Sequence, residues 1–520
     1  MASPHSVAEQ PGRVLLRFGL PGAIASGLIT MGAFGVGWLP LRTGVIDVPL
    51  VEALRNSTVG QLLAHSLVFI GLALLLQVWL LLGHHLSAGL TTSPLTLAGV
   101  AAAWSAPLLI APPMFSRDVY SYYLQGRLVM SGFDPYADGV AVLPGWFQDG
   151  ADPMWAETPT PYGPLFLLVS RGVASFSIDQ PALAALVFRL VALVGVALII
   201  YFLPRLAYAH GINPSRALWL GALNPLVIMH FVAGAHNDAL MAGLVVMGLT
   251  LAVERHPVAA AAIIALAASI KPIGLLALPF VGLLWAGSRA GWGRRVGAWV
   301  AVAAVAALTF AATAVIAGVG WGWISALGTP GEVRTWLSPP TALGMLTGGI
   351  GQAIGLADTN DAFVTIFRAV GTVAALIAVA WLALRPQGRS PVRGAAWAFT
   401  AVVVLGPVVQ PWYLLWLLPL FAATGLTIVG LRWLILVIAG FTVHGMAESL
   451  ATADNLFELT DGIGIIAAFA IVGLVLILSS RERQLLLGTG ATSALMPMTP
   501  AEQDRAGRLI QHAAWQDGRP

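Results

Sequence analysis

Long apolar stretches limit the folds open to this chain more than any other feature of its sequence. A helix needs about 20 mainly apolar residues to cross a bilayer, and we count about fourteen stretches that approach this length. Charged residues make up 9% of the 520 residues, against about 25% in soluble domains. We therefore predict an all-α polytopic membrane protein. The predicted spans cover residues 17–40, 60–83, 94–112, 181–206, 217–233, 239–254, 257–271, 273–288, 296–318, 362–384, 395–409, 412–425, 431–447 and 462–480.

Charge divides the loops between these spans into two sets. Most of the 26 basic residues, Arg255 and Arg289 among them, fall on one side, and most of the acidic residues fall on the other. Cytoplasmic loops are the ones enriched in Lys and Arg. The pattern predicts a multi-pass plasma-membrane protein with both termini cytoplasmic: a tail at 1–16, a transmembrane domain at 17–480 and a tail at 481–520. The basic residues are scattered over short loops, so we expect no nucleic-acid partner.

Two long segments on the outer side, at 113–180 and 319–361, are the natural place for a functional site. Loops of this length are usually functional or disordered. Both are rich in Trp, Tyr and Pro, a composition that argues against disorder.

The first of these outer segments contains an Arg–Asp pair at the start of a predicted helix. Ser116 is a candidate N-cap, followed by Arg117 and Asp118. Helical spacing places Asp118, Tyr122 and Gln125 on one face. Such a helix would lie along the membrane interface. Asp118 is then either part of a chemical site or half of a solvated Arg–Asp pair that contributes little.

Three further basic residues are candidate ligands for an anion. Lys271 is the only lysine in the chain, and its compact ammonium suits a phosphate, although it could also be a snorkelling interfacial lysine. Arg189 and Arg368 lie inside predicted spans. An arginine there costs about 2.5–3.5 kcal/mol on insertion scales, so a partner such as an anionic lipid headgroup is expected.

Polar and aromatic residues near other outer helix ends complete the candidates. His236 and Asp238 follow the span at 217–233, and Trp412 and Tyr413 follow Pro411. The two aromatic residues fit either an interfacial belt or a stacking platform for a sugar. His444 and Glu448 lie one turn apart, but no third ligand has a recognisable spacing, so we predict no metal site.

The outer loop resembles a known family. Phe115-Ser116-Arg117-Asp118-Val119-Tyr120-Ser121-Tyr122, Gly132-Phe133-Asp134-Pro135-Tyr136 and Pro161-Tyr162-Gly163-Pro164 are similar to motifs of actinobacterial polyprenol-phosphate-mannose-dependent α-1,6-mannosyltransferases. Asn224-Pro225-Leu226, His236-Asn237-Asp238 and Pro411-Trp412-Tyr413 resemble further motifs of that family. The resemblance runs from about residue 90 to 450 and implies a fold of the GT-C glycosyltransferase class.

The resemblance also implies an activity. Members of the family transfer mannose from a β-linked polyprenyl phosphomannose to the α-1,6-mannan backbone of lipomannan and lipoarabinomannan, with inversion. The acid of the first outer loop is the general base of this class, which maps to Asp118. No cofactor is implied. The partners would be the lipid donor, the lipid-linked mannan acceptor and the membrane, and the site would face outward.

The remaining site residues follow from what this chemistry requires. A basic pocket for the donor phosphate can take the place of a metal, and the candidates, in order, are Arg117, Lys271, Arg189 and Arg368. For the acceptor or its sugar rings the candidates are Tyr122, Gln125, His236, Asp238, Trp412 and Tyr413.

A transporter or lipid flippase is the alternative reading of so many spans. Such proteins place ionisable groups near the bilayer midplane on broken helices, often in two related halves. Here the acidic residues gather at one face and no halves are evident. A structural or lipid-binding membrane protein ranks third.

Overall fold

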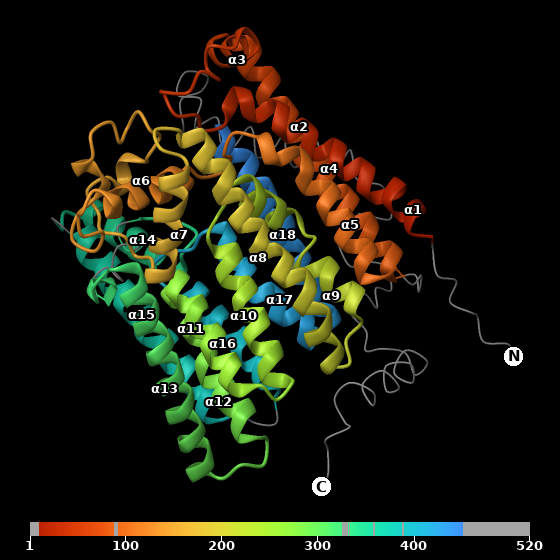
Figure 1. The fold of residues 1–520 in the computed structure, drawn as a ribbon, viewed down its shortest axis with the longest axis vertical. Coiled ribbons are helices and arrows are strands. Elements are labelled where there is room, and N and C mark those ends of the chain that lie inside the picture. Colours follow the sequence, from red (N-terminus) through yellow and green to blue (C-terminus); the bar gives the residue numbers. More distant parts are fainter. Residues whose placement is uncertain are drawn as a thin grey trace, which may run out of the picture.

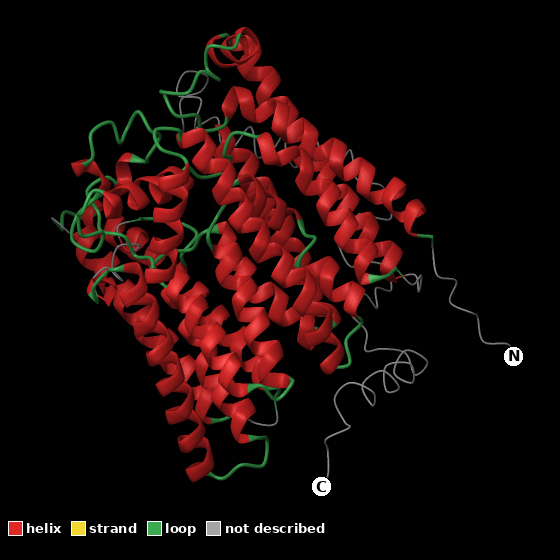
Figure 2. Ribbon diagram, in the orientation of Figure 1, coloured by secondary structure: helices red, strands yellow, loops and turns green. Residues whose placement is uncertain are grey.

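The computed structural model describes residues 10–87, 92–324, 331, 333–356, 359–386 and 389–450. Within these ranges the regular elements are helices (Figures 1 and 2), which confirms the all-α prediction. The first part of the chain forms α1 (Pro11–Val14), η1 (Leu15–Gly19), α2 (Leu20–Val36), α3 (Pro49–Asn56), α4 (Thr58–Ser87), α5 (Pro94–Ser105), η2 (Ala106–Ile110), α6 (Asp118–Met130), η3 (Val140–Val142), η4 (Pro153–Trp155), α7 (Pro164–Phe176), α8 (Pro181–Ala209) and α9 (Pro214–Gly221).

The second part repeats the pattern of long helices joined by short breaks. It forms η5 (Val227–Ala233), α10 (Asp238–Val253), α11 (Pro257–Ile270), η6 (Pro272–Ala277), α12 (Leu278–Ala286), α13 (Trp292–Ala317), α14 (Pro339–Ala353), α15 (Thr359–Leu384), α16 (Pro391–Leu405), η8 (Pro411–Tyr413), α17 (Leu414–Thr424) and α18 (Ile428–Leu450). Many of these helices begin with proline, because proline fixes the backbone angle that a helix needs and its missing N–H is not required in the first turn.

The described helices fit a chain that crosses a membrane many times. Six are long and apolar enough to span, and a seventh span is possible if η5 and α10 are counted as one broken helix. Most of the other predicted spans up to residue 447 coincide with shorter apolar helices, such as α11 and α16. The span predicted at 217–233 is not one helix, because a break at 222–224 divides it between α9 and η5. The span at 462–480 and the tail at 481–520 lie outside the described residues. The total of about fourteen spans and the domain boundaries therefore stay predictions.

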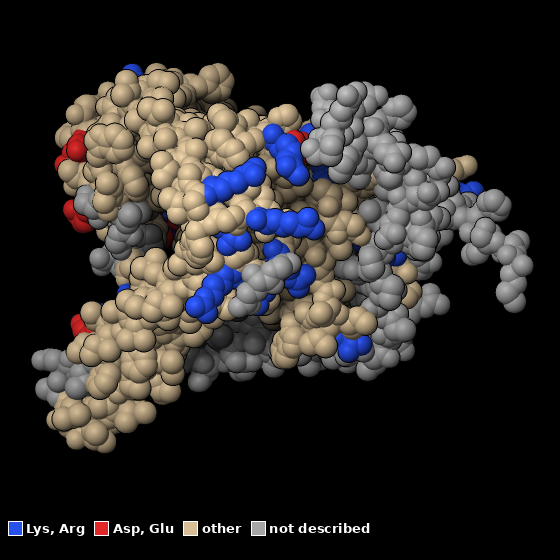
Figure 3. All heavy atoms as spheres, turned by 90° about the horizontal axis from the view of Figure 1, so that it is seen from below, with Lys and Arg blue, Asp and Glu red and all other residues tan. Residues whose placement is uncertain are grey.

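The two ends of the helix bundle differ. The longest described loops gather around α6 and α7, at the upper left of Figures 1 and 2. Arginine side chains gather on the underside of the bundle (Figure 3). These are the two sides that the charge pattern of the sequence separates.

A sharp break between η5 and α10 shapes the end of the bundle near α6. The two helices meet at 113° across residues 234–237, and Ala235 turns the chain with a positive φ of 53°. A buried break must satisfy the backbone groups that it frees. Arg189 of α8 does so by donating to the carbonyls of Val232 and Ala233. The break brings His236, Asn237 and Asp238 to one point inside the protein.

Candidate active site

Helix α6 carries Asp118, and neighbouring elements fix the position of this helix. Gly126 faces α7 so closely that a Cβ would lie 2.1 Å from the backbone oxygen of Ser170. Tyr120 Oη donates to the carbonyl of Trp38 at 2.9 Å. The helix begins at Asp118, with Arg117 rather than the predicted Ser116 in the N-cap position. Ser116 Oγ still accepts the amide of Asp118, at 3.1 Å.

Arg117 turns away from Asp118, so the solvated ion pair left open by the sequence does not form. Its guanidinium donates to the carbonyls of Gly150 and Ala151 at 2.8 and 2.6 Å. It also lies 4.7 Å from the ring of Trp38. Arg117 therefore fixes the loop that follows α6 against the start of the helix.

The break before α10 supplies a second cluster, centred on Lys271. Lys271 lies between α11 and η6, and its Nζ contacts Asp238 Oδ1 and Oδ2 at 2.8 and 3.1 Å. Trp416 Nε1 donates to the same Oδ1 at 2.7 Å. The ammonium lies 5.0 Å from the ring of Tyr413. Asp238 and the rings of Tyr413 and Trp416 thus hold the ammonium in place, since cations are attracted to ring faces.

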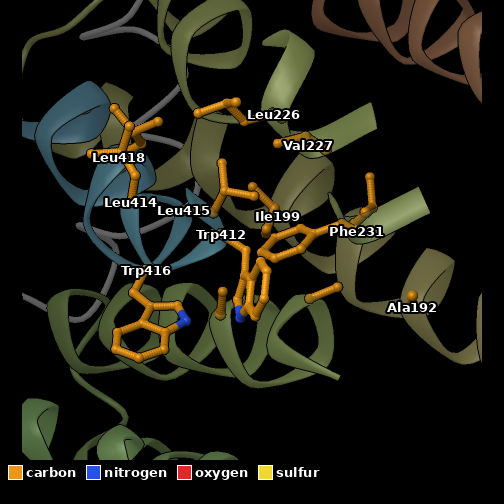
Figure 4. Packing of buried hydrophobic residues seen from close by; sticks show 14 of the residues in the cluster. Ala192, Ile199, Leu226, Val227, Phe231, Trp412, Leu414, Leu415, Trp416 and Leu418 are labelled. Carbon is orange, nitrogen blue, oxygen red and sulfur yellow. The ribbon is translucent and has the colours of Figure 1, made fainter. Parts of the chain in front are cut away.

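His236 joins the two clusters. Its Nδ1 lies 3.8 Å from Asp118 Oδ2 and 3.5 Å from Tyr122 Oη. Its ring stacks on Trp412 at 4.0 Å. Figure 4 shows Trp412 of η8 and Trp416 of α17 within the cluster of buried side chains that includes Phe231.

These groups surround a cavity of about 250 Å³, slightly smaller than the roughly 300–1,000 Å³ usual for small-molecule sites. Among the described residues that line it, Asp118 is the only carboxylate and Lys271 the only cation. The rest of its wall is aromatic, apolar or neutral and polar. It comprises Ser121, Gln125, Trp155, Thr158, Pro159, Pro161, Tyr162, Pro272, Ile273, Val333, Val402, Val403, Gly406, Pro407, Val408, Gln410, Trp412, Tyr413 and Trp416.

Burial changes the acidity of Asp118. It raises the pKa of this carboxyl from 3.8 to about 6, and the charge of Lys271 and the hydroxyl of Ser116 only partly offset that rise. The carboxylates of Asp152 and Asp238 add to it. A base of raised pKa is a better proton acceptor, and it is still mostly ionised near pH 7. The side chain keeps 19% of its surface exposed, and it lines the cavity.

Comparison with known proteins identifies the family. A family model described as alpha-(1->6)-mannopyranosyltransferase, N-terminal domain, matches residues 19–287. A second, described as MptB C-terminal domain, matches residues 340–476. The chain belongs to the α-(1→6)-mannopyranosyltransferase family. This membership confirms the resemblance drawn from the loop motifs.

Individual relatives agree over most of their length. An alpha-(1->6)-mannopyranosyltransferase of Mycobacterium tuberculosis is 36% identical in an alignment that covers 89% of this chain and 87% of the relative. Alpha-(1->6)-mannopyranosyltransferase A of the same organism is 34% identical, covering 83% and 85%. Alpha-(1->6)-mannopyranosyltransferase B of Corynebacterium glutamicum is 31% identical, covering 76% and 71%. No solved structure matches the chain at a significant level.

The structure brings five of the predicted site residues to the wall of the cavity: Asp118, Gln125, Lys271, Trp412 and Tyr413. Tyr122, His236 and Asp238 lie directly behind them. Tyr122 packs edge-to-face against Tyr162, and His236 is fully buried beneath Trp412. These three side chains support the residues of the wall and do not themselves line the cavity.

Arg189, one of the predicted phosphate ligands, joins two helix ends to each other. Arg189 donates to Leu109 and Ala111, at and just after the end of η2, as well as to the end of η5. The last carbonyls of a helix carry partial negative charge and lack helical partners, so a buried guanidinium suits two such ends at once. Arg189 is 2% exposed and does not line the cavity.

Arg368 also holds backbone segments together, but it does so behind the wall of the cavity. It donates to the carbonyls of Gly331 and Val333 and to Thr341 Oγ1. Thr341 Oγ1 in turn donates to the carbonyl of Pro407. Because Val333 and Pro407 both line the cavity, Arg368 holds the cavity wall together from behind.

Sequence reasoning missed several residues of the cavity wall. Ser121, Gln410, Trp155 and Trp416 line it and were not among the candidates. Ser121 lies one helical turn after Asp118, so the helix period that selected Gln125 could also have selected it. The position of Trp416 could not be inferred, because it depends on how α17 packs against α10.

In the described part of the chain, no group of three or more His, Cys, Asp or Glu side chains could hold a metal ion. The side chain of Glu448, which the sequence places one turn after His444, lies outside the described residues. The expectation that no metal takes part stays a prediction.

Proposed function

We propose that the chain transfers mannose from polyprenyl phosphomannose to an α-1,6-mannan acceptor, the backbone of lipomannan and lipoarabinomannan, at the outer face of the plasma membrane. The observation that carries the proposal is the pairing of charges in the cavity. A partly buried carboxylate, Asp118, and a single lysine, Lys271, line the same space, and family membership supplies the class of reaction.

In this proposal Asp118 is the general base. The acceptor 6-hydroxyl oxygen forms a bond to the anomeric carbon of the donor mannose, while the bond between that carbon and the phosphate oxygen breaks. The hydroxyl proton passes to Asp118, and the polyprenyl phosphate leaves with the bonding electron pair. One displacement of this kind inverts a β-linked donor into an α-mannoside.

Lys271 binds the phosphate of the donor. Its ammonium already lies among Asp238 and the aromatic rings of Tyr413 and Trp416, so its position is set before the substrate arrives. Fixed charges of this kind stabilise the charge that develops on a leaving group. No cofactor or metal enters the proposed reaction.

The apolar and aromatic parts of the wall suit the rest of the two substrates. Val402, Val403 and Val408, from α16 and the segment after it, offer an apolar surface for the first isoprene units of the lipid donor. Trp412 and Tyr413 offer ring faces on which a mannose ring can stack.

The direct test uses purified protein, polyprenyl phosphomannose with radiolabelled mannose, and a short α-1,6-mannoside. We expect labelled mannoside and free polyprenyl phosphate in equal amounts. We expect Asp118→Asn to lower turnover by about 10²–10⁴-fold, the usual contribution of a positioned base. Asp47→Asn is the matched control, because Asp47 is exposed and does not line the cavity.

Two results would contradict the proposal. Transfer at the original rate by Asp118→Asn would remove Asp118 as the base. Movement of the lipid across a vesicle membrane by the wild-type protein, with no release of polyprenyl phosphate, would instead favour the transporter or flippase alternative.

A further inference from the structure

Helix α6 presents a row of three polar side chains to the cavity. Asp118, Ser121 and Gln125 follow the i, i+3, i+7 spacing of one helix face, and all three line the cavity. At 1.5 Å per residue the row extends over roughly 10 Å. The row is therefore long enough to contact more than one hydroxyl group of a bound sugar.

Two members of this row are buried with unused hydrogen-bonding capacity. Ser121 is 4% exposed and Gln125 is 7% exposed. Ser121 Oγ and Gln125 Oε1 have no hydrogen-bond partner among the residues that the structure describes. An unsatisfied buried polar atom costs about 1–3 kcal/mol, so two of them on one face of one cavity require an explanation.

The chemistry of these two atoms selects the kind of ligand. An amide oxygen such as Gln125 Oε1 only accepts hydrogen bonds, so it needs a donor and repels a phosphate oxygen. An isoprenoid chain would leave both atoms unsatisfied. A hydroxyl group can donate to Gln125 and can either donate to or accept from Ser121, which fits the hydroxyl groups of a sugar.

The position of the row favours the acceptor sugar over the donor sugar. Asp118 is at one end of the row, and under the proposed function this carboxylate contacts the attacking hydroxyl of the acceptor. Lys271, the proposed phosphate ligand of the donor, comes from the junction of α11 and η6 and not from α6. The row therefore continues from the attacking hydroxyl along the acceptor.

We propose that Ser121 and Gln125 form the acceptor subsite, binding hydroxyl groups of the hexose whose 6-hydroxyl faces Asp118 and of the hexose next to it. This inference rests on the proposed function. It adds Ser121 as a binding residue and assigns Gln125 to the acceptor.

The test compares Ser121→Ala and Gln125→Met with the wild-type full-length protein, using an octyl α-(1→6)-dimannoside as acceptor. We expect the acceptor KM to rise about 3–10-fold for each variant, the loss of one hydrogen bond. The KM for polyprenyl phosphomannose should stay within about twofold. Ser121→Ala should not lower the Tm, because it removes a buried hydroxyl that has no partner.

Ser170→Ala is the matched control. Ser170 Oγ is also buried without a partner, but Ser170 belongs to α7 and does not line the cavity. Its acceptor KM should equal that of the wild type. Dimannosides that each lack one hydroxyl group extend this test. Removal of the hydroxyl that Ser121 binds should raise the acceptor KM of the wild type but not that of Ser121→Ala, as in a double-mutant cycle.

The outcomes separate this inference from the function on which it rests. A wild-type protein that transfers no mannose would refute the proposed function. Transfer by the wild type, combined with equal acceptor KM values for Ser121→Ala and Ser170→Ala, would refute the acceptor subsite alone. A rise in donor KM without a rise in acceptor KM would also refute it.

Discussion

At the scale of a single residue, opposing effects set the pKa of the Asp118 carboxyl. Burial disfavours its ionised form, while Lys271 and Ser116 favour it, and the pKa settles at about 6. A general base must be ionised to accept a proton. Activity should therefore fall as the pH drops through the pKa of this carboxyl.

We predict an acidic limb near pH 6 in the profile of kcat/KM, which reports groups of the free enzyme. The measurement is initial transfer rate against pH at low acceptor concentration. An Asp of ordinary acidity would instead keep the rate constant down to about pH 5. A profile of kcat/KM that is flat between about pH 7 and pH 5 would show that the Asp118 carboxyl is not the titrating base.

A fall in pH, which lowers activity by protonating Asp118, should raise the contribution of this residue to stability. Its pKa is higher in the folded chain than the ordinary 3.8, so the folded chain binds this proton more tightly than the unfolded chain does. Its contribution to stability therefore grows as the pH falls from above 6 towards 4, and the ionised form is unfavourable at neutral pH. Asp118→Asn should thus reduce turnover without lowering the Tm at neutral pH, which calorimetry in detergent can check.

The three arginines predicted as phosphate ligands mark the limit of reasoning from single residues. An arginine inside an apolar span needs a partner, and that inference holds for Arg189 and Arg368. The partners are backbone carbonyls at the ends of helices and loops. Sequence can indicate that a buried charge has a partner, but the identity of that partner depends on which helix ends meet it.

At the scale of elements, Arg189 joins two helix ends that the site requires. It ties the end of η2, which leads to Asp118, to the end of η5, which leads to His236. We predict that Arg189→Lys lowers the free energy of unfolding by at least about 3 kcal/mol, because one ammonium cannot satisfy all four backbone carbonyls that Arg189 binds. A reduced Tm in detergent is the measurement.

Arg205→Lys is the control for this prediction. Arg205 forms a more exposed pair with Glu254, and such pairs contribute at most about 1 kcal/mol. If Arg189 instead bound the donor phosphate, Arg189→Lys would raise the KM for polyprenyl phosphomannose and leave the Tm unchanged.

At the scale of the whole molecule, the candidate site and the arginine-rich face lie in different parts of the bundle. The cavity lies beside α6, in the region of the long loops, and the arginine-rich face lies on the underside of the bundle. Basic loops usually face the cytoplasm. The site should therefore face outward.

The chain contains no cysteine, so single cysteines can report this topology. Glu157 lies in the loop after α6 and Arg289 in the loop between α12 and α13, and both are exposed. We predict that a membrane-impermeant maleimide labels Glu157→Cys in intact cells and labels Arg289→Cys only after lysis. The reverse pattern would place the site in the cytoplasm.

The sequence alone determined the helical class, the position of most apolar helices and several residues whose side chains could take part in chemistry. Each of these depends on properties that are local along the chain: apolar length, helix period, charge and the loop motifs. Asp118, Gln125 and Lys271 were identified in this way, and all three line the cavity.

Only the tertiary structure decided which candidates share a space. Arg117 is next to Asp118 in sequence and turns away from it, whereas Lys271 is far along the chain and faces the same cavity. The broken helix at 234–237 and the packing of α17 on α10 bring Asp238 and Trp416 to Lys271. Contacts between distant segments depend on how whole helices pack, and no local pattern of residues encodes that packing.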